Sequence, residues 1–336
     1  MNLSIYYAGP NDTPIANEDS DFVSQLSKSA GSFPFLATCN SPKNADIIVL
    51  DERYQYRTWH YIDELLKCGF VRQYADRICV VNHDSFARVF LPGLYTSLER
   101  RSFPLIDATP IPYKRDLWKI TPPDSFEFNP SQLYSFVGTF HTHPIRYKLC
   151  KTLASIGLGT CKELRKAFHD HDENDQTQYI KQIRDAQFSL CPRGLSPSTY
   201  RLYESMQLGR CPVVISDDWL PPDGPDWEKF IIRVPEAEID ALPSILSQNS
   251  HRAEQYGRIA FDTWKRHFSW PQRYRYFTQR ILDFFENRSM SRDFTELYDI
   301  WTSKQFRKTY GWTPSGRAGQ LLKRHWNRFI SHELFP

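Results

Sequence analysis

The sequence predicts an α/β protein built from parallel β-sheets covered by helices. Short apolar runs alternate with segments in which apolar residues recur every three or four positions, the pattern of alternating strands and amphipathic helices. The runs at 45–50 (ADIIVL) and 77–81 (RICVV) are almost continuously apolar, which is typical of strands buried on both faces. Each run is followed at once by polar residues, where a parallel strand meets a ligand crevice.

Length and composition fit a globular protein of two domains. The chain has 336 residues, of which 40% are apolar and 24% charged. A formal net charge of +3 is too small to predict a nucleic-acid partner. Its seven cysteines are scattered and odd in number, so we expect reduced thiols rather than disulfides, and no Cys/His spacing predicts a zinc site.

The first domain is expected over 1–125. A strand at 3–8 ends before Gly9–Pro10, helical spacing follows at 22–29, and the strand at 45–50 leads into Asp51. A helix is predicted at 58–68, and the strand at 77–81 precedes Asn82, His83 and Asp84. Six prolines between 100 and 133 exclude long helices, so we place the inter-domain connection there.

The second domain is expected over 126–271. It opens with a strand at 133–137 and a helix at 146–156, and a further helix at 179–186 leads to a strand at 188–191. A turn-rich loop at 192–199 precedes a helix at 200–208, which stops at Gly209 before a strand at 212–216. Helices are predicted at 239–246, 252–267 and 272–285, the last beginning a helical segment over 272–336.

The stretch 188–217 carries a specific motif. Its order C-P-R-G-x-S-P-x-[ST]-[FY]-R-L-[FY]-E-[AS]-x-x-x-G-x-x-P-V-V-I-S-D resembles the core signature of exostosin-type glycosyltransferases, and 220–236 resembles that family's continuation. The likeness is strong over 188–236, fair over 134–150 and weak elsewhere. Ser198 replaces a frequent Trp and Leu195 a common polar residue, which leaves the transferred sugar open.

The resemblance implies a GT-B fold, in which two Rossmann-like domains place their parallel sheets across a cleft. It also implies an inverting transferase that moves a sugar from a nucleoside-diphosphate donor, expected to be a UDP-sugar, without a bound metal or other cofactor. The acceptor would be a glycan or a lipid-linked glycan, and helices within 272–300 would cross back to the first domain.

Donor binding is expected at the two loops that follow the strands at 133–137 and 188–191. By resemblance, Glu204 binds the ribose hydroxyls; the alternative is an exposed helix glutamate that pairs with Arg201. Arg193 is expected to neutralise the diphosphate leaving group, or else to tie its loop together. Arg146 has a phosphate role and a surface role as equal alternatives. The remaining donor-side candidates, of which the serine and threonine also fit helix caps, are Gly138, Ser196, Thr199 and Arg201.

The catalytic base is expected in the first domain, because an inverting mechanism needs a proton acceptor beside the attacking hydroxyl. His83 and Asp84 follow a predicted buried strand, and Asn82–His83 resembles a pair in the family. Asp12 and Asp51 are rivals, since they also follow predicted strands.

Two His-x-His pairs, His141/His143 and His169/His171, invite a metal site. Alternate residues bind one metal well only on an extended strand. Because both pairs lie in predicted loops, we expect no metal site.

The N-terminus lacks the pattern of a signal peptide, and no apolar run is long enough to span a membrane. We therefore expect a cytoplasmic protein, unlike the Golgi-anchored members of the family. The basic aromatic segment 320–335 has helical spacing and either packs on the protein or contacts an anionic membrane peripherally. Two alternative functions stay open: an inactive carbohydrate-binding scaffold and a fucosyltransferase that uses GDP-fucose.

Overall fold

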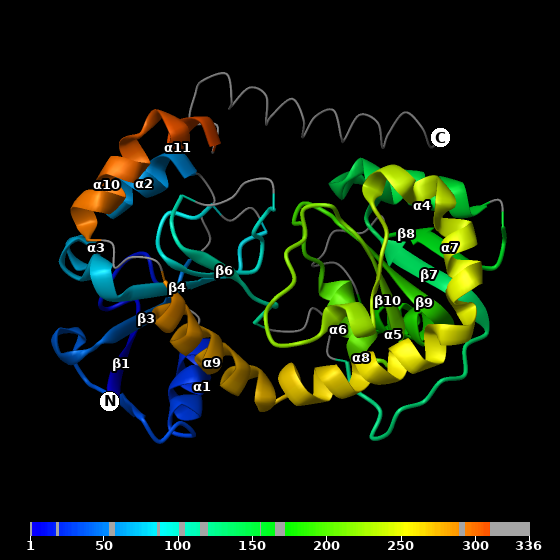
Figure 1. Cartoon of the computed structure of the whole chain (residues 1–336), viewed down its shortest axis with the longest axis horizontal. Coiled ribbons are helices and arrows are strands. Elements are labelled where there is room, and N and C mark those ends of the chain that lie inside the picture. Colours follow the sequence, from blue (N-terminus) through cyan, green and yellow to red (C-terminus); the bar gives the residue numbers. More distant parts are fainter. Residues whose placement is uncertain are drawn as a thin grey trace. The chain divides into compact units, whose positions relative to one another are not determined.

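The computed structural model describes residues 2–17, 20–53, 58–85, 88–100, 105–114, 120–154, 156–164, 172–288 and 293–309. The chain forms two compact units. The first unit takes its described residues from Met1–Lys114, Leu220–Asp223 and Trp270–Gln320, and the second from Arg115–Trp219 and Gly224–Ser269. Figure 1 shows each unit as a sheet with helices against it. The α/β class, with a parallel sheet in each of two Rossmann-like units, is therefore confirmed.

The first unit holds a six-stranded sheet in the order β2-β1-β3-β4-β5-β6, and all its strand pairs are parallel. Its strands are β1 (Leu3–Ala8), β2 (Leu36–Thr38), β3 (Ile47–Asp51), β4 (Ile78–Asn82), β5 (Gly93–Tyr95) and β6 (Ala108–Pro110). Its helices are α1 (Ser20–Ala30), α2 (Thr58–Lys67), α3 (Gly69–Tyr74), α9 (Gln272–Asn287), α10 (Phe294–Thr302) and α11 (Lys304–Thr309).

Alternate residues of β3 and β4 enter cores on opposite faces of this sheet. Ile48 and Val80 pack in a cluster with α2, α3, α10 and α11, whereas Val49 and Cys79 pack with α1 and α9. Both strands are completely buried, which explains their nearly continuous apolar sequences. The chain thus returns, through α9 to α11, to cover both faces of the sheet with which it began.

The second unit holds a five-stranded parallel sheet in the order β11-β10-β9-β7-β8. Its strands are β7 (Gln132–Gly138), β8 (Gly159–Glu163), β9 (Ala186–Pro192), β10 (Cys211–Ile215) and β11 (Ile232–Arg233). Its helices are α4 (Pro144–Ala154), α5 (Glu173–Arg184), α6 (Tyr200–Gln207), α7 (Leu242–Asn249) and α8 (Ala253–His267). Helices α4 and α7 contribute Leu149 and Leu246 to one core with Phe188 and Val213 of the central strands.

The strands expected from continuous apolar runs are all present as β1, β3, β4, β7, β9 and β10, with bounds within two residues of those predicted. The short strands β2, β5, β6, β8 and β11 were not predicted. Among them, β8 is only partly buried, so its sequence lacks the apolar run that marks the central strands.

Candidate functional site

The strand order of the second unit puts two loops at its topological switch point. From β7 the chain first goes to β8 on one side and then crosses to β9 on the other. In open parallel sheets the crevice at such a reversal, outside the carboxyl ends of the two strands, is where ligands bind. Arg146, in the first turn of the helix that follows β7, and Arg193, in the loop that follows β9, are the two predicted phosphate-binding arginines, and they come together at this edge.

Arg146, on the first turn of α4, joins the ends of β7 and β9. Its Nε donates to the backbone oxygen of Arg193 at 2.9 Å, and its Nη1 donates to that of Thr139 at 3.0 Å. A third, longer bond runs from Nη2 to the oxygen of Pro192 at 3.4 Å. These contacts exclude a purely exposed role for Arg146 and orient its guanidinium at the switch point.

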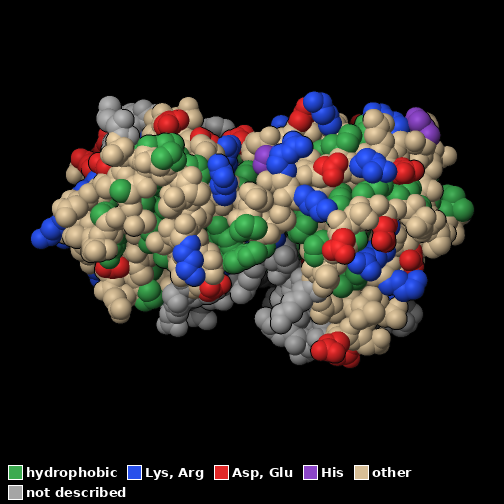
Figure 2. All heavy atoms as spheres, turned by 90° about the horizontal axis from the view of Figure 1, so that it is seen from below, with side chains coloured by type: hydrophobic (Ala, Val, Ile, Leu, Met, Phe, Trp, Pro, Cys, Tyr) green, Lys and Arg blue, Asp and Glu red, His purple; other side chains and the backbone are tan. Residues whose placement is uncertain are grey.

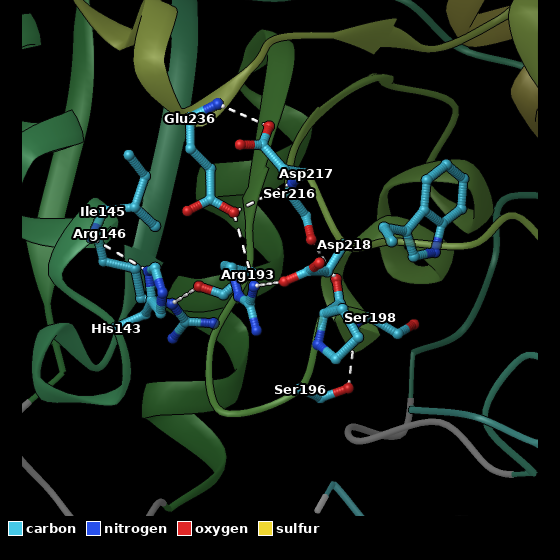
Figure 3. A network of polar contacts seen from close by, with 12 residues as sticks. His143, Ile145, Arg146, Arg193, Ser196, Ser198, Ser216, Asp217, Asp218 and Glu236 are labelled. Atoms are coloured by element: carbon cyan, nitrogen blue, oxygen red, sulfur yellow. Dashed lines mark hydrogen bonds and ion pairs between the residues drawn. The ribbon is translucent and has the colours of Figure 1, made fainter. Parts of the chain in front are cut away.

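Arg193 extends the linkage to the next two strands. Its Nη1 donates to Oδ2 of Asp218 at 2.6 Å and lies 3.7 Å from Oε1 of Glu236 (Figure 3). Asp218 follows β10 and Glu236 follows β11, while the Arg193 side chain is only 5% exposed. The interpretation of Arg193 as a residue that ties its loop together therefore describes its contacts, and the two carboxylates offset much of its charge.

The loop between β9 and α6 is compact. The Ser196 hydroxyl accepts the Ser198 amide at 3.1 Å, and the Ser216 hydroxyl donates to the oxygen of Pro197 at 2.9 Å. Thr199 is the N-cap residue of α6, but its side chain makes no capping hydrogen bond. The expected cap chemistry is therefore absent at Thr199, whose side chain is half-buried.

Arg201 and Glu204 face inward from α6. The Arg201 guanidinium donates to the oxygen of Val137 and lies over the ring of Phe136 at 4.6 Å. Glu204 is 1% exposed and accepts the Tyr179 hydroxyl of α5. The interpretation of Glu204 as an exposed helix residue is therefore wrong.

The charged and polar groups of this inward-facing network shift one another's pKa. Burial raises the pKa of the Tyr179 hydroxyl well above its ordinary value, with Arg201 opposing and Glu204 adding to the rise. Burial alone lowers the pKa of the Arg201 guanidinium, but Tyr179, Cys191 and Glu204 outweigh it, and the net shift is upward. Gly138 lies against this network, since a Cβ there would be 3.2 Å from Phe136 and 3.4 Å from Nη2 of Arg201.

In the first unit, His83 follows β4 and is 7% exposed. Its Nδ1 contacts the Thr96 hydroxyl at 3.0 Å, and its ring meets Phe22 and Phe277 edge to face. Asp84 is 8% exposed, and its amide donates to Oδ1 of Asn82 at 2.9 Å. The predicted catalytic pair is thus buried at this edge of the sheet.

The two rival carboxylates differ in environment. Asp51 is 2% exposed and forms a buried ion pair with Lys114. Asp12, in the loop after β1, is half-buried and accepts the Tyr6 hydroxyl and the Gly9 amide, each at 2.8 Å.

Within the described residues, no group of three or more His, Cys, Asp or Glu side chains could hold a metal ion. His143 accepts the Ile145 amide at 3.3 Å beside the start of α4. His169 and His171, like the segment 320–335, lie outside the residues that the structure describes.

None of the described helices is both long and apolar enough to traverse a bilayer. The face shown in Figure 2 carries acidic and basic side chains interspersed over both units.

Asp218 and Glu236 were not singled out from the sequence as partners of Arg193. The signal was present, because Asp218 stands three residues after the β-branched run of β10 and polar residues at strand ends gather at one edge of a parallel sheet. Glu52 was also not singled out from the sequence as the hydrogen-bond partner of Asn82, for a different reason. Its carboxylate accepts Asn82 at 2.6 Å and the Tyr61 hydroxyl, contacts between segments 30 and 9 residues apart that no local pattern reveals.

Comparison with known proteins bears on the second unit. Residues 123–249 match the model of the exostosin GT47 domain. The chain is 35% identical over 85 residues to an exostosin-1 homolog of Caenorhabditis elegans, and 35% identical over 80 residues to a probable beta-1,4-xylosyltransferase IRX10 of Arabidopsis thaliana. These alignments cover 25% and 23% of this chain, and 22% and 19% of those relatives. The chain therefore spans about a fifth of the length of the curated relatives it matches.

Two solved structures are distantly similar. TarM aligns with a TM-score of 0.40 at 11% identity, covering 72% of this chain and 54% of TarM. Acinetobacter baumannii MurG aligns with a TM-score of 0.33 at 10% identity, covering 84% of this chain and 98% of MurG. The sequence match is the more specific finding, because it includes β7, β9, α6 and β10 together with both arginines of the switch point. Residues 123–249 are therefore similar in sequence to the exostosin GT47 domain.

Proposed function

We propose that this protein is an inverting glycosyltransferase that moves a sugar from a UDP-sugar to a glycan or lipid-linked glycan acceptor. One observation carries the proposal: the exostosin GT47 match covers the switch point at which Arg146 and Arg193 bring together the ends of four parallel strands. The two-unit α/β architecture is the one expected of a GT-B transferase.

In this mechanism the second unit binds the donor. Transfer leaves negative charge on the β-phosphate, and guanidinium groups and helix N–H groups fixed before the reaction stabilise that charge. Arg193, held by Asp218 and Glu236, would form the rigid wall of the phosphate site, and Arg146 would orient both loops. Gly138, Ser196, Thr199 and Arg201 remain donor-side predictions, and Glu204 remains the predicted ribose ligand.

The test begins with nucleotide binding by the full chain. We expect UDP to raise the melting temperature more than GDP does, and a panel of UDP-sugars to give a product with p-nitrophenyl glycosides that is one sugar heavier by mass spectrometry. Activity should survive EDTA, because the proposed mechanism uses no metal. Stabilisation by GDP alone would favour a fucosyltransferase, and UDP binding without transfer or hydrolysis would favour a scaffold.

The cytoplasmic location and the peripheral membrane contact through 320–335 also remain proposals. Co-sedimentation with anionic vesicles, comparing the full chain with a chain truncated after residue 319, tests the contact. Equal sedimentation of the two proteins would contradict it.

A further inference from the structure

The strand order of the first unit also defines a switch point. From β1 the chain goes to β2 on one side and then crosses to β3 on the other. The crevice at this reversal lies outside the carboxyl ends of β1 and β3. Two of the base candidates border it: Asp12 follows β1, and Asp51 ends β3. His83 and Asp84 follow β4, one strand further along the sheet.

Burial and pairing separate these candidates. Asp51 is 2% exposed and ion-paired with Lys114, and it also accepts Asn17 Nδ2 at 3.3 Å. His83 is 7% exposed and stands between two phenylalanine rings. Asp12 is half-buried, so it is the least buried of these three candidates. A general base must come within hydrogen-bond distance of the hydroxyl it deprotonates, which favours Asp12.

The Asp12 carboxylate is also oriented. Its Oδ1 accepts the Tyr6 hydroxyl and its Oδ2 accepts the Gly9 amide, each at 2.8 Å. The Asp12 amide donates back to the Gly9 oxygen at 3.0 Å, which closes the turn. Each carboxylate oxygen has a second lone pair, so both structural bonds can persist while a substrate hydroxyl donates a third.

We propose that Asp12 is the general base of the transfer reaction and that Tyr6 is its positioning residue; this rests on the proposed glycosyltransferase function. Asp12 takes the proton of the acceptor hydroxyl as that oxygen forms its bond to the anomeric carbon. The bond from the anomeric carbon to the β-phosphate oxygen breaks, and its electron pair leaves with the nucleoside diphosphate. The inference places the acceptor hydroxyl at the carboxyl ends of β1 and β3.

The central variant is Asp12→Asn in the full chain. It keeps the size of the side chain and removes the proton acceptor, so kcat should fall by about 100-fold or more while the UDP-induced rise in melting temperature is retained. Asp46→Asn is the matched control. Asp46 also accepts two bonds, from the amide and hydroxyl of Ser4, but it precedes β3 at the opposite edge of the same sheet. Its kcat should equal that of the wild type.

Tyr6→Phe tests the positioning role and keeps the proposal testable if Asp12→Asn is poorly folded. Loss of one orienting bond should lower kcat, calculated per folded protein so that a fold defect is not counted, about tenfold at unchanged KM for the UDP-sugar.

The outcomes distinguish the two levels of the proposal. A wild-type protein that neither binds UDP nor transfers sugar would overturn the proposed function. A wild-type protein that does both, with Asp12→Asn transferring within about twofold of it, would overturn the role of Asp12 alone. Full activity in Tyr6→Phe would overturn the positioning role. A loss of kcat in His83→Gln that exceeds the loss in Asp12→Asn would identify His83, which follows β4, as the general base in place of Asp12.

Discussion

The guanidinium of Arg193 and the carboxylate of Asp218 form a buried ion pair at 2.6 Å, with side chains 5% and 9% exposed. This pair joins the end of β9 to the residues after β10, next to the loop that the exostosin signature covers. Its burial means that neither charge can be removed without leaving the other in a poorly solvated position.

Asp218→Ala should therefore lower the free energy of unfolding by about 3 kcal/mol, because Glu236 at 3.7 Å offers only a weaker substitute for the lost partner. Urea denaturation measures the change. Asp240→Ala is the control, since Asp240 pairs with Lys148 at 2.8 Å on the exposed surface and should change stability little. Equal losses in the two variants would show that the buried pair is no more important than a surface pair.

Gly194→Ala should displace Arg146. An added Cβ would lie 2.8 Å from Nη2 of Arg146, whose guanidinium is held by three backbone oxygens and cannot move without losing some of them. We expect a loss of about 1 kcal/mol in the free energy of unfolding and weaker UDP binding. Gly69→Ala, where a Cβ meets nothing within 4 Å, should lower neither stability nor UDP binding. A Gly194→Ala protein that binds UDP as the wild type does would separate Arg146 from donor binding.

Tyr179→Phe and Glu204→Gln separate stability from the predicted ribose contact. Tyr179→Phe removes the hydroxyl that Glu204 accepts, so it should lower the free energy of unfolding by about 1–3 kcal/mol without loss of UDP affinity. Glu204→Gln should weaken UDP binding at least about tenfold, measured by calorimetry, if the carboxylate binds the ribose hydroxyls. Unchanged affinity in Glu204→Gln would leave Glu204 with the buried network alone.

Stability should fall as the solution becomes alkaline. Burial raises the pKa of Tyr6 and of Tyr134 to about 12, above the value of about 10 for an unfolded chain. The fold thus favours the neutral phenols: their contribution is complete below about pH 10 and is lost as pH rises towards 12. Urea denaturation at about pH 9 and pH 11 should show the loss, with a smaller difference in Tyr134→Phe. An equal loss of stability between about pH 9 and pH 11 in the wild type and in Tyr134→Phe would contradict this prediction for Tyr134.

The sequence was sufficient for the central strands because each is buried on both faces and must be apolar throughout. Ile48 and Val49 pack in different cores, yet both positions require aliphatic side chains. The strand β3 can therefore be predicted from its own sequence, without knowledge of the strands beside it. The edge strand β8 has no such requirement, since its residues are only partly buried. Its place depends on pairing with β7, a relationship that local sequence does not carry.

In the candidate site, too, some features follow from local sequence and others depend on how the unit packs. Arg146 and Arg193 follow predicted strands, so their convergence could be expected from parallel topology. Their individual contacts could not be predicted in the same way. Strand-end position brings Asp218 to the edge where Arg193 lies but does not pair the two residues, and Arg146 binds backbone oxygens 46 and 47 residues away. The inward orientation of Glu204 depends on where α5 presents Tyr179, which only the packed unit determines.

Arg146 binds its neighbours through peptide oxygens, which every amino acid supplies. The loop positions 139 and 192 can therefore exchange side chains during evolution or engineering without removing the acceptors that Arg146 uses. Position 146 itself has no such latitude, because a lysine presents one nitrogen where three separate nitrogens of the guanidinium are engaged. Libraries that aim to alter sugar preference can vary those two loop positions while keeping residues 146 and 193 fixed.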